Sequence, residues 1–345
     1  MTFTQSGASM PLKGLGPRWA RQAAQVAALV AAALGAAGPA QAQQTAAQAA
    51  LPGQIKIVVP FAAGASTDAA ARAVASELAK RTGGNVIIEN LPGASTFIGA
   101  AAVAKAPKDG SVILMTSSST FTAAATKQVV PIDVNADLLP VAQLSEGPLI
   151  VASSMQSNIR TPAELVAAAR ARPDEITHGT GGIGTLAHVA AEMINDAARI
   201  QLKHVPYKSA SLAMNDFVAG RIDLMIGVYT TVASQVKAGR LHLVAVTSAQ
   251  PHPSFPGVPT MASVAPGLNI GIWVGFFAPP GTPAGVVQRL NRELNEVAKS
   301  RAVLDVIGQD GSVPRALTPQ EFGSTVRSSY AAWKKLATDK NIVVD

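Results

Sequence analysis

The sequence predicts an α/β protein of two lobes, with sheets of parallel strands flanked by helices. Short β-branched runs alternate with helical patterns along most of the chain, which is the rhythm of α/β folds. A chain of 345 residues is long enough for two lobes. The long apolar run at residues 270–277 fits a strand that crosses from one lobe to the other.

The stretch at residues 55–78 predicts a strand, a tight turn and a helix. Residues 55–59 are mostly β-branched, and Pro60 ends the strand because it cannot donate to a sheet ladder. Gly64 lets the backbone approach a ligand closely, and Ser66 or Thr67 can cap the helix that follows. Because unpaired N–H groups at a helix start attract anions, this unit predicts an anion cradle.

Further elements follow from the same apolar periods and turn signals. Residues 116–120 form a hydroxyl-rich loop, and Thr-Pro pairs mark several helix starts. The strands are predicted at 85–89, 111–115, 141–144, 149–152, 176–179, 203–207, 222–226 and 241–247, and the main helices near 95–105, 162–171, 186–193, 212–219, 232–238, 283–299 and 319–338.

The N-terminus predicts a secretory signal peptide at residues 1–42. It begins with a basic region, continues with an apolar run at 23–37, and ends in an Ala-Gln-Ala cleavage site. Residues 43–53 then form a flexible leader. The rest carries 25 basic against 21 acidic residues, because three of the 28 Lys and Arg lie in the signal. This mild charge and the 4% aromatic content argue against nucleic-acid binding. Cysteine is absent, so an exported protein here relies on its core without disulfides.

Several motifs have a structural and a functional interpretation. Residues 179–184 match G-x-G-x-x-G, but no acidic residue follows at the spacing that a dinucleotide site needs, which favours a tight turn. His178, His188 and His204 have no common metal-ligand spacing, so we expect structural histidines, no metal and no cofactor. Asp68 is either a general base or, as we favour, the partner of a helix dipole.

An ordered set of segments resembles the Bug/TctC receptors, the extracytoplasmic solute-binding proteins of tripartite tricarboxylate transporters. The resemblance covers residues 54–345. Its segments are Val58-Val59-Pro60-Phe61 with Gly64 and Asp68, Glu89-Asn90 with Pro92-Gly93-Ala94, His178-Gly179-Thr180 with Thr185 and His188, His204-Val205-Pro206-Tyr207-Lys208, and Gly275-Phe276-Phe277-Ala278-Pro279.

This resemblance implies a two-lobed periplasmic binding protein of type II-like α/β fold, with mixed sheets flanked by helices and a ligand cleft between the lobes. Such a receptor closes on a small carboxylate, which is held by main-chain amides and hydroxyls of the cleft loops. The ligand-binding residues that it implies are Phe61, Ala62, Gly64, Ser66, Thr67, Ser117 and Ser119 in the first lobe and Thr180, Gly182, Thr185 and Tyr207 in the second. The loops at 60–68, 116–120 and 179–185 contain no arginine. One departure bears on the ligand: many members carry an aspartate where this chain has Gly227.

The domain boundaries that we expect are 54–149 with 272–345 for lobe one and 150–271 for lobe two, with closure about the crossing strands. The resemblance implies a periplasmic monomer that delivers its ligand to permease subunits of a tripartite tricarboxylate transporter. Two alternatives stay open: a receptor of the same fold that signals to a sensor kinase, and an exported hydrolase using Ser66 or Ser117 with His188. The chain contains no nucleophile–base motif, which counts against the hydrolase.

Overall fold

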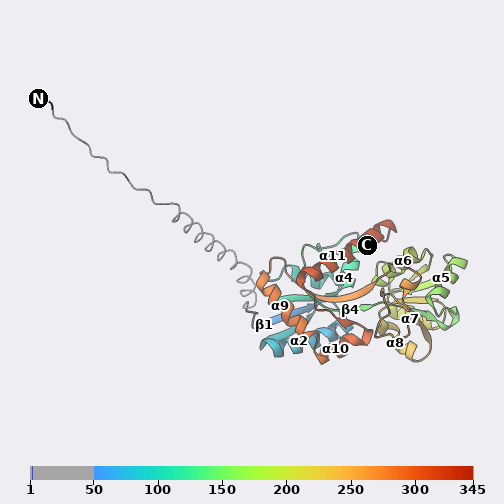
Figure 1. Cartoon of the computed structure of the whole chain (residues 1–345), viewed down its shortest axis with the longest axis horizontal. Coiled ribbons are helices and arrows are strands. Elements are labelled where there is room, and N and C mark those ends of the chain that lie inside the picture. Colours follow the sequence, from blue (N-terminus) through green and yellow to red (C-terminus); the bar gives the residue numbers. More distant parts are fainter. Residues whose placement is uncertain (1, 3–49, 345) are drawn as a thin grey trace. The chain divides into compact units, whose positions relative to one another are not determined.

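The computed structural model describes residue 2 and residues 50–344. Apart from residue 2, the predicted signal peptide lies outside the described residues, as does most of the predicted leader. Residues 49–345 form one compact unit that contains two sheets, one of six strands and one of five. Figure 1 shows α2, α9 and α10 beside the first sheet and α5 to α8 around the second. In the described part of the chain, no helix is long and apolar enough to cross a membrane.

The six-stranded sheet has the strand order β11-β4-β10-β3-β1-β2. β1 pairs in parallel with β2 and β3, whereas β10 runs antiparallel to both β3 and β4. The sheet is therefore mixed, as the resemblance implies. Its strands are β1 (Gln54–Val59), β2 (Asn85–Asn90), β3 (Val112–Ser117), β4 (Leu139–Pro148), β10 (Gly271–Ala278) and β11 (Val313–Pro314).

Helices cover both faces of this sheet because each presents an apolar stripe to it. Along α2, the buried residues Ala71, Val74 and Leu78 follow a helical period. The helices on this side of the molecule are α2 (Ser66–Thr82), α3 (Phe97–Ala104), α4 (Ser118–Thr126), α9 (Ala284–Val297), α10 (Arg301–Ile307) and α11 (Pro319–Asp339), with short 3₁₀ turns η1 (Ala94–Thr96) and η4 (Gly308–Asp310).

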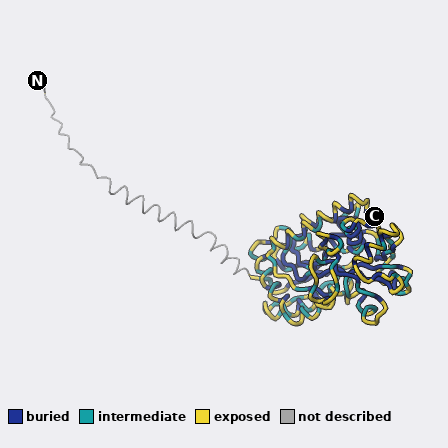
Figure 2. The backbone as a smooth tube through the Cα atoms, turned by 45° about the vertical axis from the view of Figure 1, so that its right-hand side comes forward, coloured by how far each residue is buried: buried dark blue, intermediate teal, exposed yellow. Residues whose placement is uncertain are grey.

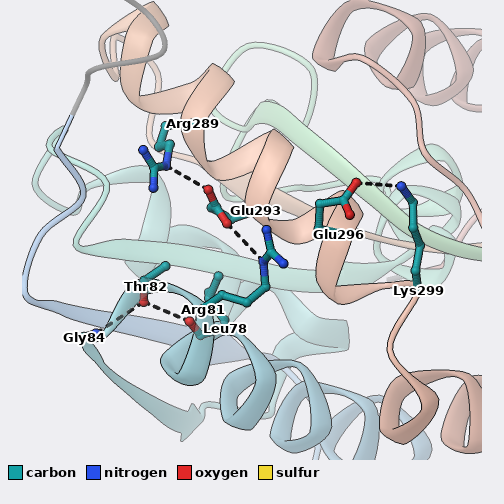
Figure 3. A network of polar contacts seen from close by, with 8 residues as sticks. All are labelled: Leu78, Arg81, Thr82, Gly84, Arg289, Glu293, Glu296 and Lys299. Atoms are coloured by element: carbon teal, nitrogen blue, oxygen red, sulfur yellow. Dashed lines mark hydrogen bonds and ion pairs between the residues drawn. The ribbon is translucent and has the colours of Figure 1, made fainter.

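A buried carboxylate joins α2 to α9 (Figure 3). Glu293 on α9 lies 3.1 Å from the guanidinium of Arg81 on α2 and 2.9 Å from that of Arg289 one turn earlier. The Glu293 side chain is 8% exposed, so two guanidinium groups share a carboxylate that is mostly removed from water. The neighbouring Glu296–Lys299 pair is exposed at the surface. This network fixes α9 against α2 on the outer side of the six-stranded sheet.

The five-stranded sheet has the order β7-β6-β8-β5-β9. β6 is parallel to β7 and β8, and β5 is antiparallel to β8 and β9. Its strands are β5 (Ile150–Ser154), β6 (Thr177–Thr180), β7 (Lys203–Pro206), β8 (Leu224–Gly227) and β9 (Leu241–Val246). Its helices are α5 (Pro162–Ala171), α6 (Leu186–Ala198), α7 (Ala210–Val218) and α8 (Tyr229–Lys237), and the 3₁₀ turns η2 (Met155–Ser157) and η3 (Met261–Ser263) complete this side.

One threonine ties the two chain segments that connect the sheets. Thr247 is fully buried, and its Oγ1 lies 2.9 Å from both the backbone N and O of Leu149 and 2.6 Å from the backbone O of Ile270. The backbone N–H of Ile270 donates to the O of Thr247 at 3.0 Å. Both connections between the sheets are therefore hydrogen-bonded to one residue. The predicted division into two lobes that hinge here stays a prediction.

The hydrophobic core is continuous across the two sheets. One cluster of buried side chains includes Phe97 and Trp333 on the six-stranded side and Val189 and Leu224 on the five-stranded side. Figure 2 shows that the buried residues, in dark blue, lie in the interior of the unit. At the surface of the same junction, Lys340 forms an ion pair with Asp196 on α6 at 2.5 Å. The junction between the two sheets is thus held both by packed apolar side chains and by a surface ion pair.

Four elements differ from the sequence-based expectation. Residues 118–126, whose first part we predicted as loop, form α4, because Ser117 caps the helix and its hydroxyl accepts a hydrogen bond from Ser119 N–H at 3.3 Å. The N-cap of α2 is Ala65, so neither Ser66 nor Thr67 caps it. α10 and the short strand β11 carry no clear pattern and were not predicted.

Candidate functional site

Four helices each follow a sheet strand directly or after a short loop. α2 follows β1 and α4 follows β3 on the six-stranded side, while α6 follows β6 and α8 follows β8 on the five-stranded side. The first N–H groups of a helix have no partner inside the helix and carry partial positive charge. Anion-binding capacity is thus concentrated at these four helix starts.

The starts of α2, α4 and α8 line one cavity of about 190 Å³, which we call the cleft pocket. Five residues of the predicted site lie in it: Phe61, Ser66, Thr67, Ser117 and Ser119. Val228, the N-cap of α8, comes from the five-stranded side. The sequence reasoning missed the remaining wall, which consists of Ala65, Ala70, Leu144, Ser145, Ile272, Val274, Val306, Ile307, Asp310 and Ser312.

The hydroxyls of Ser66 and Thr67 make no hydrogen bond to any described residue. Since α2 begins at Ser66 with Ala65 as its N-cap, these hydroxyls are not used for capping. Both lie in the wall of the cleft pocket. Among the described residues, no lysine, arginine or histidine lines that wall, and Asp310 is the one charged residue in it. The cleft pocket therefore offers N–H and O–H donors without a cationic side chain.

Asp68 holds the loop between β1 and α2 in place. Its buried carboxylate accepts hydrogen bonds from Gly64 N–H at 2.9 Å, Arg72 Nε at 3.0 Å and Asn90 Nδ2 at 2.9 Å. Asn90 Nδ2 also donates to the backbone O of Phe61 at 3.2 Å. Burial raises the pKa of Asp68, but the bonds from Arg72, Gly64 and Asn90 outweigh it and hold the pKa below its usual value. Asp68 thus positions Phe61 and Gly64.

The other two residues predicted in this loop line neither this pocket nor the one described next. Ala62 and Gly64 are exposed. Gly64 has φ +84°, a left-handed conformation that strains any residue with a side chain. A Cβ atom added at Gly64 would meet no atom within 4 Å, so the requirement for glycine here comes from the backbone angle and not from a close contact.

A second cavity of about 250 Å³, the seam pocket, lies beside the first and shares Ser119 with it. Its walls include Ser95 and Thr96 from the six-stranded side and Gly184 and Thr185 from the five-stranded side. Residues 94–96 all have positive φ, at 47°, 55° and 82°, although none is glycine. Such angles cost free energy and occur most often near functional sites.

The loop from Thr180 to Thr185 uses its polar groups internally. Thr180 Oγ1 lies 2.7 Å from His204 Nε2 and accepts a hydrogen bond from Gly182 N–H at 3.2 Å. Thr185 caps α6, and its hydroxyl donates to the O of Gly182 at 2.8 Å. Thr185 lines the seam pocket, whereas Thr180 and Gly182 line neither pocket.

Three stacked imidazoles contact the loop at residues 180–185. The rings of His188 and His204 stack with centroids 3.9 Å apart, and His178 stacks on His204 at 4.8 Å. His188 Nδ1 accepts a hydrogen bond from Gly184 N–H at 3.1 Å. Burial and the neighbouring histidines lower the pKa of His178 to about 3 and of His204 to about 4, and burial also lowers the pKa of His188. The stack is therefore uncharged at neutral pH.

The glycines of the G-x-G-x-x-G match have packing roles. A Cβ atom on Gly179 would lie 2.8 Å from the side chain of Ile222. One on Gly184 would lie 2.5 Å from Val344 and 2.7 Å from Thr126, where the C-terminal tail and α4 meet this loop. The tight packing of the turn thus accounts for these glycines.

Tyr207 points its hydroxyl to Asp216, not to either pocket. The O–H donates to Asp216 Oδ2 at 2.7 Å, and Arg221 forms an ion pair with the other oxygen of that carboxylate. Burial and the hydrogen bond to Asp216 raise the pKa of Tyr207 to about 12. The Tyr207 hydroxyl is thus used in a hydrogen bond within the five-stranded side.

The family of tripartite tricarboxylate transporter receptors matches residues 70–342 of this chain. A relative from Pseudomonas sp. (strain P51), described as a protein of the tcbD-tcbE intergenic region, is 34% identical over 238 residues, which cover 68% of this chain and 71% of the relative. BugT of Bordetella pertussis is 30% identical over 233 residues, covering 67% of this chain and 72% of BugT.

Solved structures give the same result. The periplasmic binding protein BugD is 29% identical with a TM-score of 0.69, covering 84% of this chain and 98% of BugD. An R. palustris protein solved with adipate is 28% identical with a TM-score of 0.72, at 84% and 98% coverage. MatC from Rhodopseudomonas palustris, with bound malate, is 26% identical with a TM-score of 0.68, at 82% and 98%. The chain therefore belongs to the tripartite tricarboxylate transporter receptor family and has the two-sheet fold of its periplasmic binding proteins.

Proposed function

We propose that this protein is a periplasmic solute receptor that captures a small organic carboxylate in the cleft pocket and delivers it to the permease of a tripartite tricarboxylate transporter. The convergence of the α2, α4 and α8 starts on one pocket carries this proposal. Two solved relatives contain adipate and malate, both dicarboxylates.

The chemistry of the wall fits a carboxylate. Backbone N–H groups at the helix starts and the hydroxyls of Ser66, Thr67, Ser117 and Ser119 supply donors to an anion. Each hydrogen bond to a charged group nets about 1.5–3 kcal/mol. Three or four such bonds support binding of about −8 kcal/mol, or roughly micromolar, after the cost of association.

Thr180, Gly182, Thr185 and Tyr207 stay part of the proposal as residues of the opposing side. In the present arrangement the first two support the shape of their loop. A hinge motion about the crossing segments near Leu149 and Ile270 would bring this loop toward the ligand. Small-angle scattering that shows no compaction with a tightly bound ligand would contradict this part.

Delivery to a permease requires export, which we propose from the signal peptide at residues 1–42. Mass spectrometry of the protein from a periplasmic extract tests this. We expect a chain that begins at Gln43, and a full-length chain in that extract would contradict cleavage.

Two other functions make different predictions. A receptor for a sensor kinase would bind the same ligand, so deletion of the permease genes would leave its response intact. A hydrolase would need His188 as a base near Ser66 or Ser117, but His188 Nδ1 is already bonded to Gly184 N–H inside the imidazole stack. We therefore propose binding without turnover, and hydrolysis of ester or amide substrates that Ser117→Ala abolishes would contradict it.

The first experiment is native mass spectrometry of protein purified without refolding. We expect a bound carboxylate that is released on denaturation and that rebinds with roughly micromolar affinity by calorimetry. Gly64→Val should weaken rebinding strongly, since valine is strained at φ +84°. If Gly64→Val bound normally while loss of one distant Lys or Arg abolished binding, the amide-cradle proposal would be wrong.

A further inference from the structure

We infer that Asp310 selects ligands that carry an ammonium or another strong hydrogen-bond donor in addition to the carboxylate, so that the preferred class is an amino carboxylate. This inference rests on the proposed function, because it takes the cleft pocket to be the carboxylate site. It assigns a specificity-determining role to a residue from the loop between α10 and β11.

Asp310 is the one charged side chain in the wall of the cleft pocket, among the residues that the structure describes. Every other polar lining group is a serine or threonine. The pocket has a volume of about 190 Å³. A ligand that fills so small a space has all of its functional groups close to the wall, so its second group meets either the apolar part of the wall or the Asp310 carboxylate.

The local contacts hold Asp310 in place and leave acceptor capacity. Its Oδ1 accepts a hydrogen bond from Ser312 N–H at 2.9 Å. Its Oδ2 has no hydrogen bond or ion pair to any described residue. A carboxylate has lone pairs for about four hydrogen bonds. Asp310 can therefore accept bonds from a ligand without losing the contact that orders its own loop.

The five-stranded side fixes the position of this loop. Gly311 has φ +81°, and a Cβ atom there would lie 2.4 Å from the ring of Phe255. Ser254 Oγ donates to the O of Gly311 at 3.3 Å. The loop that carries Asp310 is thus clamped between the two sides of the molecule, which keeps the carboxylate at the pocket wall.

The charge of Asp310 decides between two ligand classes. A second carboxylate on the ligand would meet a like charge in a pocket that has no cationic side chain to offset it. An ammonium group there would form a charge-assisted hydrogen bond instead. The simpler interpretation is that Asp310 only orders its turn through Ser312. Asparagine can also accept from Ser312 N–H, so Asp310→Asn separates the two interpretations.

The test is calorimetry with matched pairs of ligands of equal chain length: succinate and β-alanine, glutarate and 4-aminobutyrate, adipate and 5-aminopentanoate. In the wild type, we expect the amino acid to bind more tightly than its dicarboxylate by about tenfold, the low end for one hydrogen bond to a charged group. Asp310→Asn should remove or reverse that preference. Asp305→Asn on α10, an exposed residue paired with Arg301, is the matched control and should keep it.

The outcomes distinguish this inference from the proposed function. If a dicarboxylate binds tightly to the wild type and Asp310→Asn leaves the ratio within each pair unchanged, the inference is wrong and the proposed function stands. If none of the six compounds binds, and the ligand that co-purifies carries no carboxylate, both are wrong. A thermal denaturation scan of Asp310→Asn checks that the variant is folded.

Discussion

The two sides of the cleft use the same kinds of residue in opposite ways. On the six-stranded side, Ser66 and Thr67 line the pocket with hydroxyls that bond to no described residue. On the five-stranded side, Thr180 and Thr185 are bonded to His204 and Gly182. We infer that the first side supplies the donors for the ligand, while the second is a stiff surface that closes over it.

Asp68→Asn should have the largest effect, because it breaks the support of the binding side. Loss of the buried charge weakens the bonds from Arg72, Asn90 and Gly64 N–H, which we expect to lower the free energy of unfolding by about 1.5–3 kcal/mol. Ligand affinity should fall with it, since Phe61 and Gly64 lose their anchor. Urea denaturation and calorimetry measure both. Unchanged affinity would show that this loop does not bind.

Thr247→Val should have the next largest effect, because it separates the two connecting segments. Valine keeps the shape but leaves the N–H of Leu149 and the O of Ile270 without the hydroxyl, at a cost of about 1–3 kcal/mol in urea denaturation. Thr338→Val on the exposed face of α11 is the control and should change stability by less than about 0.5 kcal/mol. If Thr247→Val and Thr338→Val changed the stability equally, Thr247 would have no special role in holding the two connecting segments together.

Acid should weaken the five-stranded side selectively. The pKa values of His178 and His204 are lowered to about 3 and about 4, so between these values and about 6.5 the unfolded chain binds more protons than the native protein. The stability from this stack is complete above pH 6.5 and is lost as the pH falls toward 4. Urea midpoints across this range should decline, and His178→Leu should reduce the slope. A slope equal to that of the wild type would contradict it.

A pair of alanine variants should have the smallest effects and sharpen the comparison most. Ser66→Ala should weaken ligand binding by about 1–2 kcal/mol and leave stability unchanged, because the hydroxyl has no partner in the described protein. Thr180→Ala should lower stability by about 1 kcal/mol through its lost contact with His204. If Ser66→Ala lowered the stability and Thr180→Ala did not, the inferred difference between the six-stranded and the five-stranded side would be wrong.

Much of the binding side could be predicted from the sequence because its signals are local. A β-branched run followed by Pro60, Gly64 and Ser66 identifies a strand, a turn and a helix within about a dozen residues. Parallel strands end at the same edge of a sheet, so hydroxyls that follow β1 and β3 meet. The alternation of strands and helices correctly predicted an α/β fold, but it favoured parallel sheets, and the mixed sheets were implied by the family resemblance.

The rest depends on contacts that are distant in the sequence. Asp310 reaches the pocket because β4, β10 and β11 place its loop beside α2. No local sequence motif predicts that these segments lie together. Likewise, the sequence suggests Thr180 as a ligand donor. In the structure its hydroxyl is hydrogen-bonded to the ring of His204, which lies 24 residues later in the chain. A residue of the right type for ligand binding can therefore be hydrogen-bonded within the protein instead, and only the folded structure shows which of the two holds.

A crystal structure of the protein with the ligand that co-purifies tests the central claim most directly. We predict a carboxylate within hydrogen-bond distance of the backbone N–H groups at the starts of α2 and α4, near Ser66 and Ser119. A ligand bound instead by a lysine or arginine outside the cleft pocket, with no contact to these N–H groups, would contradict the account.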